Sequence, residues 1–196
     1  MAAATTFEQT FTIGGDLTVN RVGYGAMRIT GKGIWGPPEN KNEAIRVLRR
    51  AIELGVNFID TADSYGPYVS EELIAEALYP YPAGLIIATK GGLTRTGPDQ
   101  WPVNAHPDHL KEALDGSLKR LKLDRIDLYQ LHRIDPKVPA EQTFEFLKKV
   151  QQEGSEAEVV IAKSSVTATV SQPRIHKEAE RQRERFLAPL CLSASL

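Results

Sequence analysis

Four polar side chains end or follow apolar, strand-like runs of this sequence, and their types suit proton transfer. Asp60 ends the first run and Tyr65 lies in the loop five residues later, while Lys90 and His132 end the next two runs. A tyrosine hydroxyl has an ordinary pKa of about 10, and a neighbouring ammonium lowers this pKa because it favours the tyrosinate. Lys90 is the candidate ammonium, and Asp60 would pair with it, keep it charged and aim it. The four side chains therefore suggest acid–base chemistry.

The elements that would position these residues alternate between strand and helix. Apolar residues alternate at 11–13 and 17–19 around two glycines, which predicts an N-terminal hairpin, and residues 22–27 are expected to form a first core strand. Spacing of the apolar residues predicts strands at 58–60, 85–89 and 126–131 and helices at 44–54, 70–78, 107–122 and 139–153. This alternation favours a parallel sheet with right-handed crossovers. The order alone does not separate an open doubly wound sheet from a closed barrel.

Two histidines beside an aspartate raise the question of a metal site. His106 and His109 flank Asp108 in the sequence. The order His106-Pro107-Asp108 is better explained as a helix start, since proline suits the first helical position. No metal is therefore expected.

Composition limits the class of protein. With 196 residues, 41% hydrophobic and 25% charged, the chain can form one globular domain with a sizeable core. A net charge of −1 argues against a general nucleic-acid or anionic-membrane surface, which would need a basic excess. The single cysteine, Cys191, excludes an intramolecular disulfide and a cysteine-rich zinc site. The start is unlike a secretory signal and no apolar run approaches the ~20 residues of a membrane span, so a cytoplasmic α/β protein is expected.

Taken together, these motifs resemble the aldo-keto reductases. The hairpin, the segment Gly23-Tyr24-Gly25-Ala26-Met27 and the four polar side chains occur in the family's order, each at the expected end of its element. Any one motif alone is weak, because a lone carboxylate at a strand end is more often a cap or a salt-bridge residue. The resemblance covers about residues 7–154. It implies an α/β fold of the parallel (β/α) TIM-barrel type with an N-terminal β-hairpin, present as a partial barrel of about four βα units.

The resemblance also implies a reaction, the reduction of an aldehyde or ketone to an alcohol. No side chain donates a hydride, so a nicotinamide cofactor must supply it, and the family implies NADPH with NADH as the alternative. Tyr65 would be the general acid in reduction and the general base in oxidation. Lys90 would lower its pKa, Asp60 would hold Lys90, and His132 would hydrogen-bond the substrate carbonyl and orient it. The expected partner is a small-molecule carbonyl substrate.

Cofactor contacts are expected, by the same resemblance, at Gly25, Met27, Asp60 and Ser164. In the family a Ser-Asn pair holds the nicotinamide carboxamide, and Ser164 is the nearest match in this sequence.

Aromatic residues in loops are candidates for the substrate pocket. The resemblance implies that Tyr24 and Trp35 line it, although aromatic residues at such places are about as often plain packing. Trp101, in the long loop at 91–105, is equally well explained as a pocket wall and as a surface anchor.

The likeness to the family fades after Gly154. Beyond Thr167 the remaining cofactor-binding residues of the family have no visible counterpart, and the mixed charge of residues 174–185 predicts a solvated helix or disorder. We therefore divide the chain into residues 1–154, the N-terminal part of a barrel, and residues 155–196, a divergent charged tail. The change suggests a truncated, frame-shifted or alternative end.

An incomplete barrel has a physical consequence. Four parallel strands cannot close a barrel of this type, and an open sheet leaves its edges unpaired and one apolar face uncovered. The alternative to a reductase is therefore a catalytically inactive half-barrel that self-associates or binds a partner through the exposed sheet face.

Overall fold

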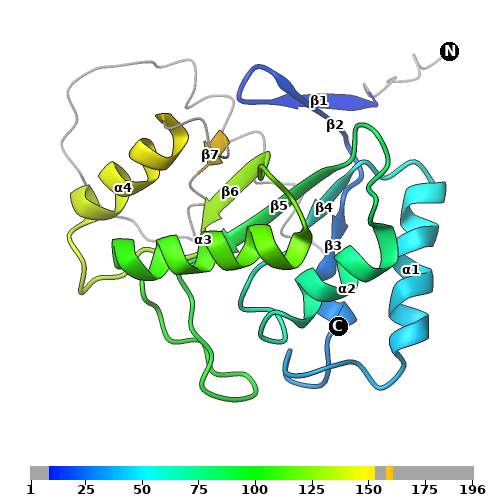
Figure 1. Ribbon diagram of the computed structural model, residues 1–196, viewed down its shortest axis with the longest axis horizontal. Coiled ribbons are helices and arrows are strands. Elements are labelled where there is room, and N and C mark those ends of the chain that lie inside the picture. The colour runs from blue at the N-terminus through cyan, green and yellow to red at the C-terminus, as the bar shows by residue number, and fades with distance from the viewer. Residues whose placement is uncertain (1–8, 153–157, 161–196) are drawn as a thin grey trace, which may run out of the picture. The chain divides into compact units, whose positions relative to one another are not determined.

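The structure, a computed structural model, describes residues 9–152 and 158–160 of the chain. They belong to a compact unit that spans Met1–Ser164. The described residues form two sheets (Figure 1). The smaller sheet is the predicted N-terminal hairpin, in which β1 (Thr10–Ile13) pairs antiparallel with β2 (Leu17–Asn20).

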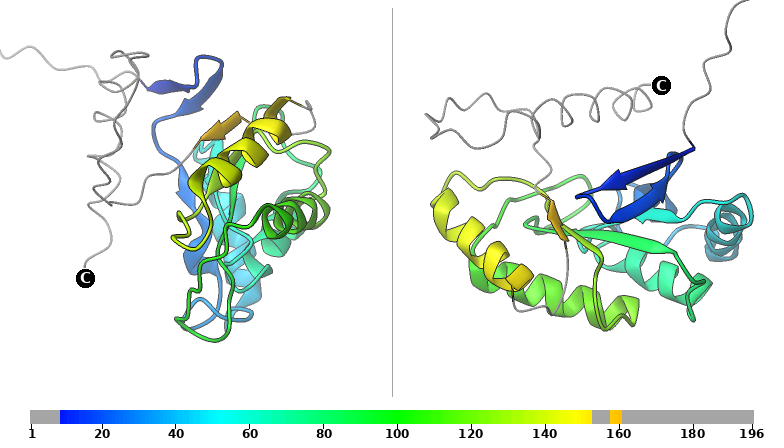
Figure 2. Two further views of the ribbon diagram at one scale, coloured as in Figure 1. Left: turned by 90° about the vertical axis from the view of Figure 1, so that its left-hand side faces the viewer. Right: turned by 90° about the horizontal axis from the view of Figure 1, so that it is seen from above.

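The larger sheet is parallel and has the strand order β3-β4-β5-β6-β7. Its strands are β3 (Tyr24–Gly25), β4 (Phe58–Asp60), β5 (Ile86–Gly91), β6 (Leu128–Leu131) and β7 (Glu158–Val160). The helices are the 3₁₀ helix η1 (Ala26–Ile29), α1 (Lys41–Glu53), α2 (Val69–Leu78), α3 (Pro107–Leu121) and α4 (Ala140–Gln152). Figure 2 shows the α-helices along one face of this sheet. The predicted parallel α/β order with four βα units is confirmed, and β7 adds a fifth strand within the residues assigned above to the tail.

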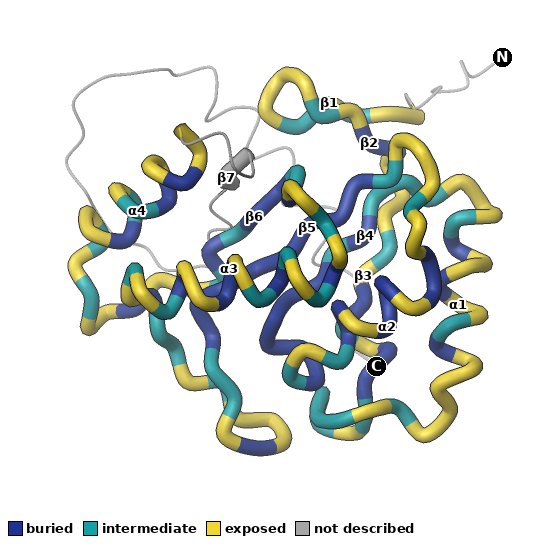
Figure 3. The backbone as a smooth tube through the Cα atoms, in the orientation of Figure 1, coloured by how far each residue is buried: buried dark blue, intermediate teal, exposed yellow. Residues whose placement is uncertain are grey.

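The core lies between the larger sheet and its helices. Ile59 of β4 and Ile74 of α2 are fully buried in one apolar cluster, and Leu110 of α3 and Tyr129 of β6 are fully buried in a second. Every residue of β5 is buried (Figure 3). A strand buried on both faces has little freedom to shift, so the residues at its end are held firmly.

The predicted core strand at 22–27 is wrong in its extent. Val22 is 73% exposed, the strand is limited to Tyr24–Gly25, and the chain then turns into η1. The turn is stabilised from a distant part of the chain, because the buried Ser70 hydroxyl of α2 donates a hydrogen bond to the carbonyl of Ala26 at 3.1 Å. Ala26 and Ile29 of η1 consequently pack into the core rather than extending the sheet.

Side-chain caps fix the starts of two helices. The Asn40 side chain accepts a hydrogen bond from the Glu43 amide at 3.0 Å before α1. His106 Nδ1 accepts one from the Asp108 amide at 3.3 Å, so the predicted helix start at His106-Pro107-Asp108 is confirmed. None of the helices in the described part of the chain has the length and apolar character that crossing a membrane requires.

Candidate active site

The carboxyl ends of β4, β5 and β6 meet at one edge of the larger sheet, and they bring Asp60, Lys90 and Gln130 together. Lys90 Nζ lies 2.6 Å from Asp60 Oδ2 and donates a second bond to the carbonyl of Thr61 at 2.8 Å. Gln130 Nε2 donates to Asp60 Oδ1 at 3.1 Å. Only 8% of Lys90 is exposed, so these partners compensate a charge that has lost most of its hydration.

Tyr65 lies beside this ion pair, in the loop that follows β4. Lys90 Nζ is 3.4 Å from Tyr65 Oη and 5.1 Å from the centre of its ring. Burial raises the pKa of Tyr65, the Lys90 charge lowers it, and the Asp60 charge raises it again, with burial the largest effect. Lys90 therefore acts in the expected direction, but the net lowering of the pKa expected from the sequence is wrong for this structure, because burial of the tyrosine outweighs the ammonium. The hydroxyl stays protonated at neutral pH and can donate a proton.

His132 completes the group of four side chains that the sequence singled out. Its ring lies edge-on to the Tyr65 ring with centroids 5.8 Å apart, and Ser64 Oγ lies 3.4 Å from its Nδ1. Burial, followed by the charges of Lys90 and Arg133, lowers the pKa of His132 from 6.5 to about 3. The imidazole is therefore neutral at physiological pH. When Ser64 donates to Nδ1, the ring proton lies on Nε2, where it can be donated to a ligand.

Of the predicted cofactor residues, Gly25 lies beside Asp60, Met27 lies close by in η1, and Ser164 cannot be placed. Gly25 pairs with Asp60 in register, is exposed, and has no atom within 4 Å of the place where a Cβ would stand, so the space beside Asp60 is open. Met27 is half-buried in η1, two residues further on. Ser164 lies outside the described residues.

Of the aromatic residues considered for the substrate pocket, two lie near Tyr65 and one does not. The backbone of Trp35 bridges that of Gly66, directly after Tyr65, which brings the loop of Trp35 to the site. Trp101 is half-buried and contacts the Tyr65 ring edge-on with centroids 6.4 Å apart, a position that fits a pocket wall better than a surface anchor. Tyr24 is not brought to this group, since it pairs with the core residue Ile59 and faces α1.

A layer of buried charge behind the site was missed by sequence reasoning. Glu71 of α2 is fully buried, pairs with Arg120 Nε of α3 at 2.6 Å, and accepts a bond from Thr89 Oγ1 at 2.6 Å. Asp63 is 4% exposed, and no described residue hydrogen-bonds its Oδ1. Burial and the Glu71 charge raise the pKa of Asp63 to about 7. These contacts join segments far apart in the sequence, so no local pattern predicts them.

Gln130 was also missed, although the sequence contains a signal for it. Gln130 lies two residues before His132, and side chains two apart on a strand share a face. A polar side chain at that position of a strand buried on both faces is expected to meet a polar partner, here Asp60.

Comparisons with known proteins agree on a family. The model of the aldo/keto reductase family matches residues 21–185. The match thus extends past Gly154, the residue after which the motifs described above fade. An uncharacterised oxidoreductase of Schizosaccharomyces pombe is 56% identical over 140 residues, which cover 71% of this chain and 45% of that protein. The pyridoxine 4-dehydrogenase of Escherichia coli is 44% identical over 151 residues, covering 74% of this chain and 52% of the relative.

Solved structures show the same partial correspondence. The glycerol dehydrogenase of Gluconobacter oxydans superimposes with a TM-score of 0.70 at 33% identity, covering 78% of this chain and 48% of that one. An aldo-keto reductase of Bacillus halodurans in its holo form gives a TM-score of 0.66 at 31% identity, covering 78% and 50%. The predicted partial (β/α) barrel is thereby confirmed. The chain spans about half the length of the relatives it matches.

The ionisation of Asp63 predicts how stability depends on pH. Its folded pKa of about 7 lies above the unfolded value of 3.8, so the wild type is stabilised below about pH 4 and loses this contribution as the pH rises to about 7. Asp63→Asn cannot ionise. Its unfolding free energy relative to the wild type should therefore rise over this window, by at most about 1.4 kcal/mol per pH unit, and then level off. Urea unfolding at several pH values measures the difference. Asp16→Asn, on the exposed hairpin turn, is the control, and a pH-independent difference for Asp63→Asn would contradict the assignment.

The burial of His132 predicts that its ring does not titrate near neutral pH. In NMR spectra that resolve the histidine ring signals, the His132 signal should keep the chemical shift of the neutral imidazole from about pH 8 to about pH 5, because its pKa is about 3. His132→Gln identifies the signal by removing it from the four expected. A midpoint near 6.5 would mean that the ring is hydrated and not packed against Tyr65.

Proposed function

We propose that this chain, which belongs to the aldo/keto reductase family, carries the proton-donating half of a nicotinamide-dependent carbonyl reductase. The observation that carries the proposal is the contact of Lys90 Nζ with both Asp60, at 2.6 Å, and Tyr65 Oη, at 3.4 Å, at the carboxyl ends of parallel strands. In a parallel barrel these ends are where catalytic residues gather. The reaction would reduce an aldehyde or a ketone to an alcohol.

Each of the four side chains has a role that its surroundings support. Tyr65, protonated at neutral pH, donates its hydroxyl proton to the carbonyl oxygen of the substrate. The ammonium of Lys90 then stabilises the tyrosinate that remains, and Asp60 holds this ammonium in place. The neutral ring of His132 donates a hydrogen bond to the same carbonyl oxygen and orients it. In the oxidative direction the tyrosinate would accept the proton, which favours alkaline pH.

A nicotinamide cofactor fits the residues at this edge of the sheet. When bound, the cofactor would supply the hydride. The open space beside Gly25 and the partly exposed carboxylate of Asp60 leave room for a flat ring and a hydrogen-bond acceptor for it, with Met27 nearby. Ser164 is the further candidate contact from the sequence. We propose NADPH, on the family resemblance, with NADH as the alternative to be tested beside it.

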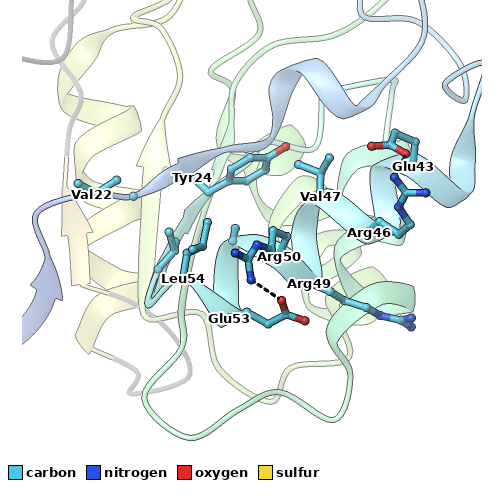
Figure 4. Close-up of a pocket in the computed structure, with 12 residues that line it drawn as sticks. Val22, Tyr24, Glu43, Arg46, Val47, Arg49, Arg50, Glu53 and Leu54 are labelled. Carbon is cyan, nitrogen blue, oxygen red and sulfur yellow. Dashed lines mark hydrogen bonds and ion pairs between the residues drawn. The ribbon is translucent and has the colours of Figure 1, made fainter.

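A second candidate function has its own observation. An open groove of about 680 Å³ lies between β3 and α1, and Figure 4 shows Tyr24, Val47 and Leu54 along it. Val22 is 73% and Leu54 67% exposed, and in the described part of the chain β3 pairs with a strand on one side only. An unpaired strand edge next to exposed apolar side chains favours addition of another strand. This supports the alternative of a half-barrel that acts by self-association or by binding a partner.

Substitution of Tyr65 tests the first function. Tyr65→Phe removes the donated proton and little volume, so the rate of NADPH oxidation with an aldehyde should fall at least about 100-fold. The increase in melting temperature that NADPH produces in the wild type should remain, because a ligand stabilises the state that binds it. Tyr79→Phe, at an exposed tyrosine away from the site, should change neither value. Retention of most of the wild-type rate by Tyr65→Phe would rule out its role as the acid.

Substitution in the groove tests the second function. If the groove joins two copies, light scattering after gel filtration should find a dimer, and Val22→Lys with Leu54→Lys should convert it to a monomer. Ile134→Lys, at an apolar residue that is 50% exposed elsewhere, is the matched control. A monomer that binds NADPH would count against this function and for the first one. A dimer that withstands both groove substitutions would place the interface elsewhere.

A further inference from the structure

Arg95, in the long loop after β5, makes an unusual set of contacts. Its guanidinium donates hydrogen bonds to five backbone carbonyl groups. These are Gln100 at 2.8 Å from Nε, Ile34 at 2.7 Å and Ser64 at 2.8 Å from Nη1, and Gly33 at 3.1 Å and Gly97 at 3.2 Å from Nη2. The acceptors come from three segments, the loop before α1, the loop after β4 and the loop of Arg95 itself. One side chain therefore ties together three loops that are distant in sequence.

The same guanidinium lies against both tryptophans of the chain. Its central carbon is 3.6 Å from the ring centre of Trp101 and 5.5 Å from that of Trp35. The sequence contains two tryptophans in all. A guanidinium is planar and weakly hydrated, so it can stack on an indole while its N–H groups bond in its plane, which a lysine cannot do. Arg95 thus fixes the positions of both indoles.

The loops that Arg95 joins surround Tyr65. Its acceptor Ser64 immediately precedes Tyr65, and the Gly36 amide, next to Trp35, donates to the carbonyl of Gly66 at 2.6 Å. Trp101 contacts the Tyr65 ring edge-on at 6.4 Å. Both indoles remain half-buried, so part of each is accessible. The two indoles therefore contribute accessible aromatic surface close to Tyr65.

We propose that Arg95 is a positioning residue that holds Trp35 and Trp101 as walls of the substrate pocket beside Tyr65, and that these walls select carbonyl substrates with a flat aromatic group over small aliphatic ones. The inference rests on the proposed function, because it takes the carbonyl group to be bound at Tyr65. Arg95 itself touches neither the reacting atoms nor the proton. Its loss should therefore act on substrate affinity and leave the chemical step largely unchanged.

The first test needs no enzymatic activity. Because the only tryptophans of the sequence are the two beside Arg95, tryptophan fluorescence reports on the surroundings of these two indoles. Arg95→Ala should shift the emission to longer wavelength and increase quenching by acrylamide, with far-ultraviolet circular dichroism unchanged. Arg95→Lys keeps the charge but not the planar set of donors and should not restore the wild-type signal. Arg46→Ala, at an exposed arginine of α1, is the matched control and should change nothing.

The second test measures selectivity. With NADPH, Arg95→Ala should raise KM for para-nitrobenzaldehyde about tenfold or more, raise KM for propanal much less, and leave kcat for both nearly unchanged. Saturable quenching of tryptophan fluorescence by para-nitrobenzaldehyde, weaker in the variant, measures the affinity for the aromatic aldehyde without turnover. If Arg95→Ala does not fold, Trp101→Ala supplies the same comparison of the two aldehydes.

The outcomes separate this inference from the proposed function. Unchanged fluorescence in Arg95→Ala, or an equal loss for both aldehydes that falls on kcat, would overturn the inference. A wild type that turns over neither aldehyde would instead count against the proposed function, and the fluorescence measurements would still decide the role of Arg95.

Discussion

The buried ammonium of Lys90 is the constraint on which the arrangement of this site depends. A charge that is 8% exposed is tolerated only where partners replace its water, and here Asp60 and the Thr61 carbonyl do so while Gln130 holds the far oxygen of Asp60. These groups come from the ends of three adjacent strands and the loop after the first. They converge only if the strands are parallel and in this register, since a shift of one residue would turn each side chain to the other face. Pairing in the sheet and compensation of the Lys90 charge therefore both require parallel strands in this register.

β5 has charged groups next to both of its faces. Lys90 points towards the site, while Thr89, its neighbour on the strand, bonds to Glu71, which pairs with Arg120 on the helical side. Burial of Tyr65, rather than the ammonium of Lys90, has the largest effect on the pKa of its hydroxyl. Burial keeps the hydroxyl protonated, which suits a proton donor. In the proposed reaction, Tyr65 would donate this proton to the substrate, and Lys90 would then stabilise the tyrosinate that remains.

The residues at the strand ends were predictable, because the spacing of apolar residues differs between strands and helices and so shows where each strand ends. Apolar runs located Asp60, Lys90 and His132, and parallel order placed them at one edge. The turn at η1 was not predictable, because it depends on a hydrogen bond from Ser70 far along the chain. The contacts of Arg95 were not predictable for the same reason, since its acceptors are backbone groups of distant loops that carry no side-chain signature. Local patterns thus predict the edge of the sheet better than they predict the loops that enclose it.

The hydrogen bonds of Arg95 end on main-chain oxygens, and this has a consequence for how the loops can diverge. Every amino acid keeps its carbonyl oxygen, so replacing Gln100 removes no acceptor. Gly33 and Ile34 are more constrained, because their φ values of 69° and 53° disfavour most other residues. Side chains around the mouth of the site can therefore be exchanged while the loop scaffold persists. Such an arrangement lets recognition evolve separately from the chemistry beneath it.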